Sequence, residues 1–336
     1  MEKLTRILSI DGGGIRGIIP GQVLVALEHK LKDRTGNPDA RIADFFDLIA
    51  GTSTGGILTC IYLCPDLKKD PPHPRFSAQE AVDLYLERGG KIFDVSTWQR
   101  VRSVGGIRDE KYSEHELEEV LKEYLGELKL SQLLRPCLIT AYDIERRRTK
   151  FFTSHDAVNK EMHDYRVRDV ARATSAAPTY FQVEKMASLT EVPYALIDGG
   201  VFANNPTLCA YAEARNKLPG KPIAKQMAVL SIGTGYVKNP YEYKDARNWG
   251  VLQWVRPLFD IMMSGVSETV DYQLKQMFDA VGAPAQYLRI NSDLLFASPD
   301  MDDASKENLV HLKQEGTRIA EDFDSELDDF IKFLVP

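Results

Sequence analysis

The pentapeptide Gly51-Thr52-Ser53-Thr54-Gly55 lies between two apolar runs and determines how the rest of the chain is interpreted. Residues 45–50 before it are typical of a buried strand, and residues 57–63 after it are typical of a buried helix. A serine between a strand and a helix occupies a tight turn, and small neighbours allow the backbone to bend there. Its hydroxyl then lies at a helix N-terminus, where amides and the helix dipole favour negative charge. The pattern is equally typical of a plain turn, so Ser53 needs catalytic partners elsewhere.

Strand-like and helix-like segments alternate on both sides of this pentapeptide, from residue 4 to about residue 232. The alternation predicts an α/β fold with a doubly wound, mostly parallel central sheet. The predicted strands besides 45–50 are 4–10, 137–143, 150–153, 194–197 and 228–232, and the predicted helices include 22–32, 77–88, 167–173 and 207–217.

The chain has no convincing linker and no internal repeat. We therefore expect a single domain over residues 1–336. Its catalytic core is predicted at about 4–235, and a mainly helical C-terminal extension at about 245–336.

Three glycine-rich turns follow predicted strands: Gly12-Gly13-Gly14, the turn around Ser53, and Gly199-Gly200. Loops that follow parallel strands gather at the carboxyl edge of the sheet, where ligands bind. This placement would bring Asp198 to Ser53, and a carboxylate within hydrogen-bond reach can take the serine proton. The consecutive amides of Gly12, Gly13 and Gly14 suit an oxyanion hole.

A serine hydrolase of the usual kind would have a histidine after the acid in chain order. His311 is the one histidine that follows Asp198, and it lies in an ordinary helical pattern near an acidic tail. A catalytic pair of Ser53 and Asp198 is therefore the more economical hypothesis.

The segment Gly12-Gly13-Gly14-Ile15-Arg16-Gly17 also satisfies G-x-G-x-x-G, the pattern of dinucleotide-binding loops. However, the next strand ends at Ser53 and not at an acidic residue that could hold a ribose. We therefore expect no nucleotide cofactor. The cysteines show no metal-ligand spacing, and we expect no metal.

The formal net charge of -7 disfavours general nucleic-acid binding. The N-terminus lacks the apolar stretch and cleavage site of a secretory signal, and no segment is long and apolar enough to span a bilayer. We expect a cytoplasmic protein, at most peripheral to a membrane.

Together the three glycine-rich blocks resemble the signature blocks of the patatin-like phospholipases, in the order of that family. The segment Ala173-Thr174-Ser175-Ala176-Ala177-Pro178-Thr179-Tyr180-Phe181 also resembles a family segment that precedes the catalytic acid. The resemblance covers about residues 4–235. It implies a three-layer α/β/α fold and a lipid acyl hydrolase without metal or organic cofactor.

The resemblance also implies roles for individual residues. Ser53 is the expected nucleophile, Asp198 the base, and the amides of Gly12, Gly13 and Gly14 the oxyanion hole, while Arg16 steadies that loop or meets a phosphate. The expected substrate is a phospholipid or related glycerolipid at a membrane or micelle surface, cleaved through an acyl-enzyme.

Two other functions stay open, because some members of this family are storage proteins and some bacterial members degrade membranes when a cyclic nucleotide binds. The first would make the chain a non-catalytic storage or lipid-binding protein. The second would require an anionic activator, for which the basic candidates are Arg100, Arg102, Arg146, Arg147 and Arg148.

Residues 249–263 are unusually apolar for a segment outside the sheet pattern. One interpretation is a helix packed on the core. The other is a lid or interfacial helix that covers the cleft or enters a bilayer, as helices with tryptophan and phenylalanine can.

Overall fold

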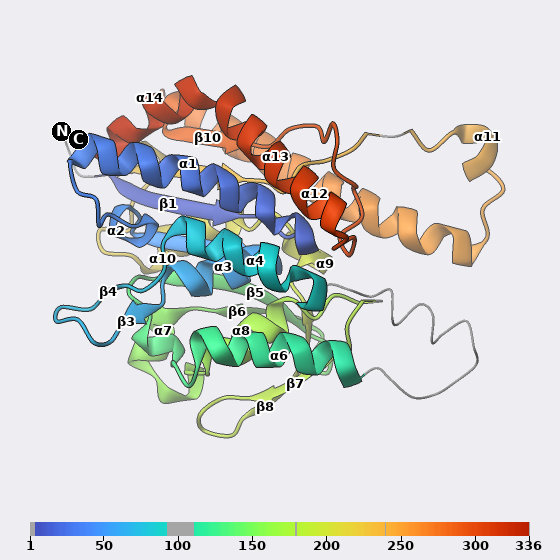
Figure 1. The fold of residues 1–336 in the computed structure, drawn as a ribbon, viewed down its shortest axis with the longest axis horizontal. Helices are drawn as coiled ribbons and strands as arrows, with labels where there is room; N and C mark the ends of the chain where they lie inside the picture. Colours follow the sequence, from blue (N-terminus) through green and yellow to red (C-terminus); the bar gives the residue numbers. More distant parts are fainter. Residues whose placement is uncertain (1–3, 93–110, 179, 239, 336) are drawn as a thin grey trace.

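The structure is a computed structural model that describes residues 4–92, 111–178, 180–238 and 240–335. Its centre is an eight-stranded sheet, with helices on both faces (Figure 1). The strand order is β10 (Tyr287–Ile290), β9 (Met227–Ile232), β1 (Thr5–Ile10), β2 (Leu48–Thr52), β5 (Cys137–Asp143), β8 (Pro193–Asp198) and β7 (Glu184–Ala187), and β6 (Arg148–Phe152) pairs with β5.

The five strands from β10 to β5 are parallel, whereas β6, β7 and β8 are antiparallel to their neighbours. The mostly parallel α/β sheet predicted from the sequence is therefore confirmed. The predictions did not include β7 and β10. Each has only four residues, and neither is a continuous apolar run.

Alternate residues of the strands face different layers of core. In β1, Ile7 packs on one face of the sheet, while Leu8 and Ile10 pack on the other. In β2, Ile49 packs on the same face as Leu8, and Ala50 packs on the same face as Ile7. The sheet is thus buried on both faces, as the middle layer of an α/β/α arrangement.

The larger helical layer covers the face that carries Leu8. Its main helices are α1 (Ile18–Thr35), α3 (Thr54–Tyr62), α4 (Ala78–Ile92), α6 (Lys111–Leu125), α8 (Val167–Thr174), α13 (Lys306–Asp322) and α14 (Asp324–Leu334). The other face is covered by α10 (Thr207–Lys217) and the C-terminal half of α12 (Val251–Ala280).

Four further short helices and a small hairpin lie between these elements in the chain. They are α2 (Ile42–Phe45), α7 (Ser154–Asn159), α9 (Gly200–Ala203) and α11 (Tyr243–Ala246), and the hairpin is β3 (Pro65–Asp66) with β4 (His73–Pro74). The strand predicted at 45–50 begins only at Leu48, because Phe45 ends α2, in which the amide of Arg41 donates to Asp44 over 2.9 Å.

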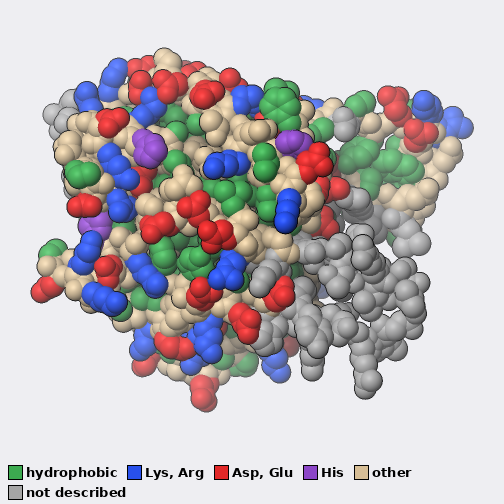
Figure 2. Space-filling view, viewed as in Figure 1, with side chains coloured by type: hydrophobic (Ala, Val, Ile, Leu, Met, Phe, Trp, Pro, Cys, Tyr) green, Lys and Arg blue, Asp and Glu red, His purple; other side chains and the backbone are tan. Residues whose placement is uncertain are grey.

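An arm formed by α11 and the N-terminal half of α12 extends away from the body (Figure 1). Val270 is the first residue of α12 that is fully buried in the part of the helix whose side chains are described. The described side chains of residues 251–263 are exposed or partly exposed, which favours the lid or interfacial interpretation of 249–263 over a helix packed on the core. Figure 2 shows hydrophobic side chains gathered on this arm.

Among the described helices, none combines the length and the hydrophobicity that crossing a bilayer requires.

Candidate active site

Ser53 lies in a strained turn between β2 and α3. Its backbone has φ 54° and ψ -122°, in a region that non-glycine residues rarely adopt. A Cβ on Gly51 would lie 2.1 Å from the carbonyl oxygen of Gly55, and one on Gly55 would lie 2.2 Å from that of Ile10. Glycine is therefore required on both sides of Ser53, and the tight elbow predicted from the sequence is present.

Asp198 lies beside Ser53 because two strands end against the same edge of β5. Thr52, the last residue of β2, is paired with Thr140 of β5, and Asp198, the last residue of β8, is paired with the next residue, Ala141. Because β6 occupies the opposite edge of β5, β2 and β8 share one edge and meet end to end.

The expected proximity of Ser53 and Asp198 therefore holds, but for a different reason. We predicted that loops would converge at the carboxyl edge of parallel strands. Instead β8 is antiparallel to β5 and brings Asp198 to the elbow from the opposite direction.

The Asp198 carboxylate is buried, and its Oδ1 accepts a hydrogen bond from the Gly200 amide over 2.7 Å. Burial raises the pKa of Asp198 to about 6, although the interactions with the Ser53 side chain and the Gly200 amide oppose the rise. At neutral pH the carboxylate is mainly ionised, yet it binds a proton more readily than an ordinary aspartate. These are properties of a general base.

The segment 173–181 also reaches the site. The Ser53 amide donates to Oγ1 of Thr174, the last residue of α8, over 2.9 Å. Ser175, Ala177, Pro178 and Phe181 then line the cleft in front of Ser53.

The glycine loop after β1 lies on the other side of Ser53. Gly13 and Gly14 line the cleft, and their amides donate to no acceptor among the described residues. The amide of Gly12, however, donates to the carbonyl of Asn204 over 3.0 Å. Gly12 was predicted as a third oxyanion donor, and this bond removes its amide from that set.

Arg16 supports the glycine loop from behind. Its Nε donates to the carbonyl of Gly13 over 3.4 Å, and its Nη1 donates to the carbonyl of Gly235 over 3.3 Å. The first contact lies within the loop after β1, and the second connects this loop to the loop after β9. Of the two expectations for Arg16, the geometry favours steadying the loop.

The cleft is lined mainly by apolar groups. Several of its wall residues were not predicted, because they come from the C-terminal part of the chain or from a turn after β8. They are Val201, Asn204, Met301 and Asp302. Met263 also lines the cleft, in agreement with the interpretation of 249–263 as a segment that covers it. Asn204 is 7 % exposed, and its Oδ1 has no partner among the described atoms. Asn204 could be identified as a cleft residue only from this buried polar atom, and burial of a single atom cannot be predicted from the sequence.

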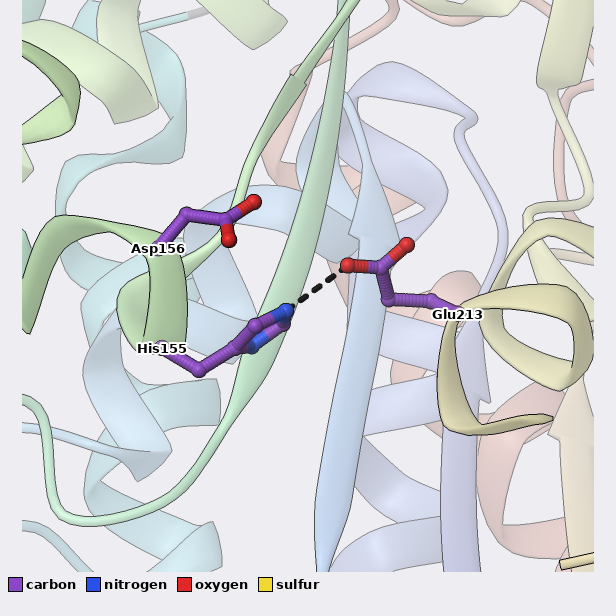
Figure 3. Close-up of side chains that lie close together, drawn as sticks. All are labelled: His155, Asp156 and Glu213. Atoms are coloured by element: carbon purple, nitrogen blue, oxygen red, sulfur yellow. Dashed lines mark hydrogen bonds and ion pairs between the residues drawn. The ribbon is translucent and has the colours of Figure 1, made fainter. Parts of the chain in front are cut away.

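None of the described residues that line the cleft is a histidine. His311 lies on α13 and is not part of the cleft wall. His155 belongs to a separate group with Asp156 and Glu213, whose possible ligand atoms lie within 4.8 Å of one another (Figure 3).

That group is held by contacts within the protein. His155 Nε2 lies 2.7 Å from Oε1 of Glu213, and Asp156 accepts hydrogen bonds from Lys217 over 2.9 Å and from Thr153 over 3.0 Å. The Lys217 ammonium already balances the negative charge of Asp156, so no metal ion is needed for this purpose. We therefore assign no metal to these side chains.

The arginines considered for an anion site do not form one in the described structure. Arg146 is bound to Asp143 over 2.8 Å and to the carbonyl of Pro193 over 3.0 Å. Arg147 lies in the exposed β5–β6 turn, Arg148 is the exposed first residue of β6, and Arg100 and Arg102 lie outside the described residues.

Comparisons with known proteins indicate the family of this chain. Residues 8–211 match the family model described as "Patatin-like phospholipase". "Patatin-like protein 2" of Oryza sativa subsp. indica is 35% identical over 352 residues, covering 97% of this chain and 86% of that protein. "Probable inactive patatin-3-Kuras 1" of Solanum tuberosum is 34% identical over 336 residues, covering 95% of this chain and 87% of that protein. The crystal structure of VipD from Legionella pneumophila aligns with a TM-score of 0.44 and 11% identity, over 97% of this chain and 67% of that one.

Proposed function

Because this chain belongs to the patatin-like phospholipase family, we propose that it hydrolyses fatty-acyl esters of phospholipids or related glycerolipids. Ser53 is the nucleophile and Asp198 the general base. The observation that carries the proposal is that Ser53 and the buried Asp198 carboxylate, whose pKa is raised to about 6, line the same apolar cleft and interact with each other.

In the first half of the reaction, Asp198 accepts the Ser53 proton as Oγ attacks the ester carbonyl. The carbonyl oxygen becomes an oxyanion, and the amides of Gly13 and Gly14 are the proposed donors to it. The ester C–O bond then breaks. The alcohol product takes the proton from Asp198 and leaves as a lyso-lipid.

In the second half, a water molecule gives a proton to Asp198 and attacks the acyl-enzyme carbonyl. The fatty acid is released, and the proton returns to Ser53 Oγ. Thr174 holds the backbone of Ser53 in the attacking position throughout, because it accepts the Ser53 amide.

The name of the Solanum relative shows that similarity to this family does not by itself establish activity. Here both Ser53 and Asp198 are present, line one cleft and interact with each other. This contact favours an active hydrolase over a storage or lipid-binding protein. Activation by an anion has no comparable support, since Arg146 is bound to Asp143.

A serine-directed fluorophosphonate probe and a lipid extract test the proposal together. We expect the probe to label the wild-type protein, and mass spectrometry to find lyso-lipid and fatty acid among the products. Ser53→Ala should lose both labelling and hydrolysis. Ser264→Ala is the matched control, because that exposed hydroxyl donates to the backbone of its own helix. A folded Ser53→Ala protein that still hydrolyses lipid would exclude this mechanism.

A further inference from the structure

We propose that the arm formed by α11 and the N-terminal half of α12 is a docking surface for an electrically neutral, zwitterionic lipid layer. This inference rests on the proposed function, since it names the surface through which the same site meets its substrate. The proposal concerns residues 241–263, which stand away from the body of the molecule (Figure 1).

The N-terminal half of α12 carries an apolar stripe that is exposed in the described structure. The stripe consists of Val251, Trp254, Leu258, Ile261 and Met262, whose exposed fractions range from 39% to 83%. Their spacing of three, four, three and one residues places all five on one face of the helix. Exposed apolar residues are common singly, but a continuous stripe marks an interaction site.

The opposite face of α12 is the one that contacts the body. Met263, Val270 and Leu274 lie about half a helical turn away from Trp254, by the periodicity of 3.6 residues. Met263 lines the cleft, while Val270 and Leu274 are buried in the core beside the sheet. Among the described side chains, one face of the helix therefore contacts the body and the opposite face is exposed.

Aromatic rings extend the stripe to the tip of the arm. Trp249 lies edge-on to Trp254, with ring centroids 5.0 Å apart, and edge-on to Tyr241, at 5.5 Å. Tyr243 is 79% exposed nearby in α11. Tryptophan and tyrosine favour the boundary between lipid chains and head groups, because each has an apolar ring and a polar atom.

The position of the cleft favours a lipid layer over a second copy of the chain. One turn of α12 carries both Met262, on the exposed stripe, and Met263, in the cleft wall. A lipid layer against the stripe would therefore lie close to the cleft entrance. An acyl chain that leaves such a layer passes from one apolar surface to another without crossing water.

The charge of the arm indicates which kind of lipid surface it fits. Residues 238–264 contain four basic and three acidic residues, so their charges nearly cancel. Strong attraction to anionic lipids requires clusters of lysine and arginine. Burial of apolar side chains is thus the expected source of binding, and this predicts weak dependence on salt.

The test uses the full chain with Ser53→Ala, so that vesicles stay intact during the measurement. Binding to phosphatidylcholine vesicles is measured by flotation, and melting temperature and light scattering report folding and oligomeric state. We expect Leu258→Ser with Ile261→Ser to lower vesicle binding at least tenfold. The matched control is Val158→Ser with Val310→Ser, two exposed apolar residues on α7 and α13, and it should bind as before.

Binding should change less than threefold when sodium chloride is raised or anionic lipid is added. Absence of vesicle binding, an unchanged affinity after the arm substitutions, or binding to anionic vesicles alone would each overturn the proposal. So would a dimer that the arm substitutions dissociate, because the stripe would then belong to a second copy. If the double variant has a lower melting temperature than the parent protein, vesicle binding is measured with the single substitution Ile261→Ser instead. Vesicle binding does not require Ser53. If the docking proposal fails, the proposed hydrolysis is therefore still tested independently by the fluorophosphonate probe.

Discussion

Arg289 binds the carboxylate of Asp11 through both terminal nitrogens, with Nη1 2.9 Å from Oδ1 and Nη2 2.5 Å from Oδ2. Both side chains are almost fully buried. Arg289 comes from β10, and Asp11 directly precedes the glycine loop. Ser267 of α12 contacts the same two groups, at 3.0 Å from Arg289 and 3.4 Å from Asp11. One ion pair therefore connects the sheet, α12 and the proposed oxyanion loop.

Replacing Arg289 by methionine should destabilise the protein and impair the loop. Burial raises the pKa of Asp11 even with Arg289 present, so removing the cation leaves a carboxyl without its main stabilising partner. Breaking a buried pair in this way costs about 3–5 kcal/mol of unfolding free energy. Urea denaturation at pH 7 measures the loss, and kcat for a soluble ester should also fall.

The control for Arg289 is Lys332→Met, which removes an exposed partner of Asp329. Exposed ion pairs contribute about 0–1 kcal/mol, so its effect should be small. If the Arg289→Met and Lys332→Met proteins had the same free energy of unfolding, the stabilising role assigned to the buried Arg289–Asp11 pair would be wrong.

The raised pKa of Asp198 predicts opposite effects on activity and stability. Activity requires the ionised base, so kcat/KM should fall tenfold per pH unit below about pH 6. Stability changes in the other direction. The folded protein binds the proton more tightly than the unfolded chain, whose aspartate has a pKa near 3.8, so the contribution of Asp198 to stability is lost as the pH rises from about 4 to 6.

Asp198→Asn should therefore be inactive but more stable than wild type at pH 7, by on the order of 2–3 kcal/mol. The difference should shrink toward pH 4, where the wild-type carboxyl is protonated. Urea titrations at both pH values measure it. Equal stabilisation at pH 4 and pH 7 would show that the effect does not come from the charge of Asp198.

Thr174 should matter through its hydroxyl and not through its shape. Thr174→Val keeps the volume but leaves the Ser53 amide without its acceptor, in a turn that is already strained. An unsatisfied buried donor costs about 1–3 kcal/mol. We expect a lower melting temperature and a lower kcat with little change in KM. Thr174→Ser, which keeps the hydroxyl, should restore most of both.

Much of the parallel part of the fold was predictable because its elements have regular hydrophobic patterns. The helix predicted at 207–217 is α10 with the same limits, and β5 covers the predicted strand 137–143. The strand that carries Asp198 was also predicted, but its direction was not. Apolar alternation marks where a strand lies and contains no information on whether it runs parallel to its neighbour.

The site was predictable where a residue type is required by chemistry or by backbone geometry. Ser53 and Asp198 are examples, since each follows a strand at a glycine-rich turn. The occupied amide of Gly12 was not predictable, because its acceptor, Asn204, is almost 200 residues away in the chain. Arg289 was missed for a similar reason: its short strand has no clear pattern, and its partner Asp11 lies at the other end of the sequence.

Met263 and its neighbour Met262 allow the two faces of α12 to be tested separately. Met263 lines the cleft, whereas Met262 is 46% exposed on the stripe. Met263→Trp should fill part of the cleft and reject longer acyl chains, because displacing one or two methylenes from an apolar pocket costs about 1–3 kcal/mol. The ratio of kcat/KM for soluble octanoyl and butyryl esters should then fall about tenfold. Met262→Trp adds the same side chain on the outer face and should leave the ratio unchanged. If both substitutions lowered the ratio equally, the assignment of Met263 to the cleft wall and of Met262 to the outer face of α12 would be wrong.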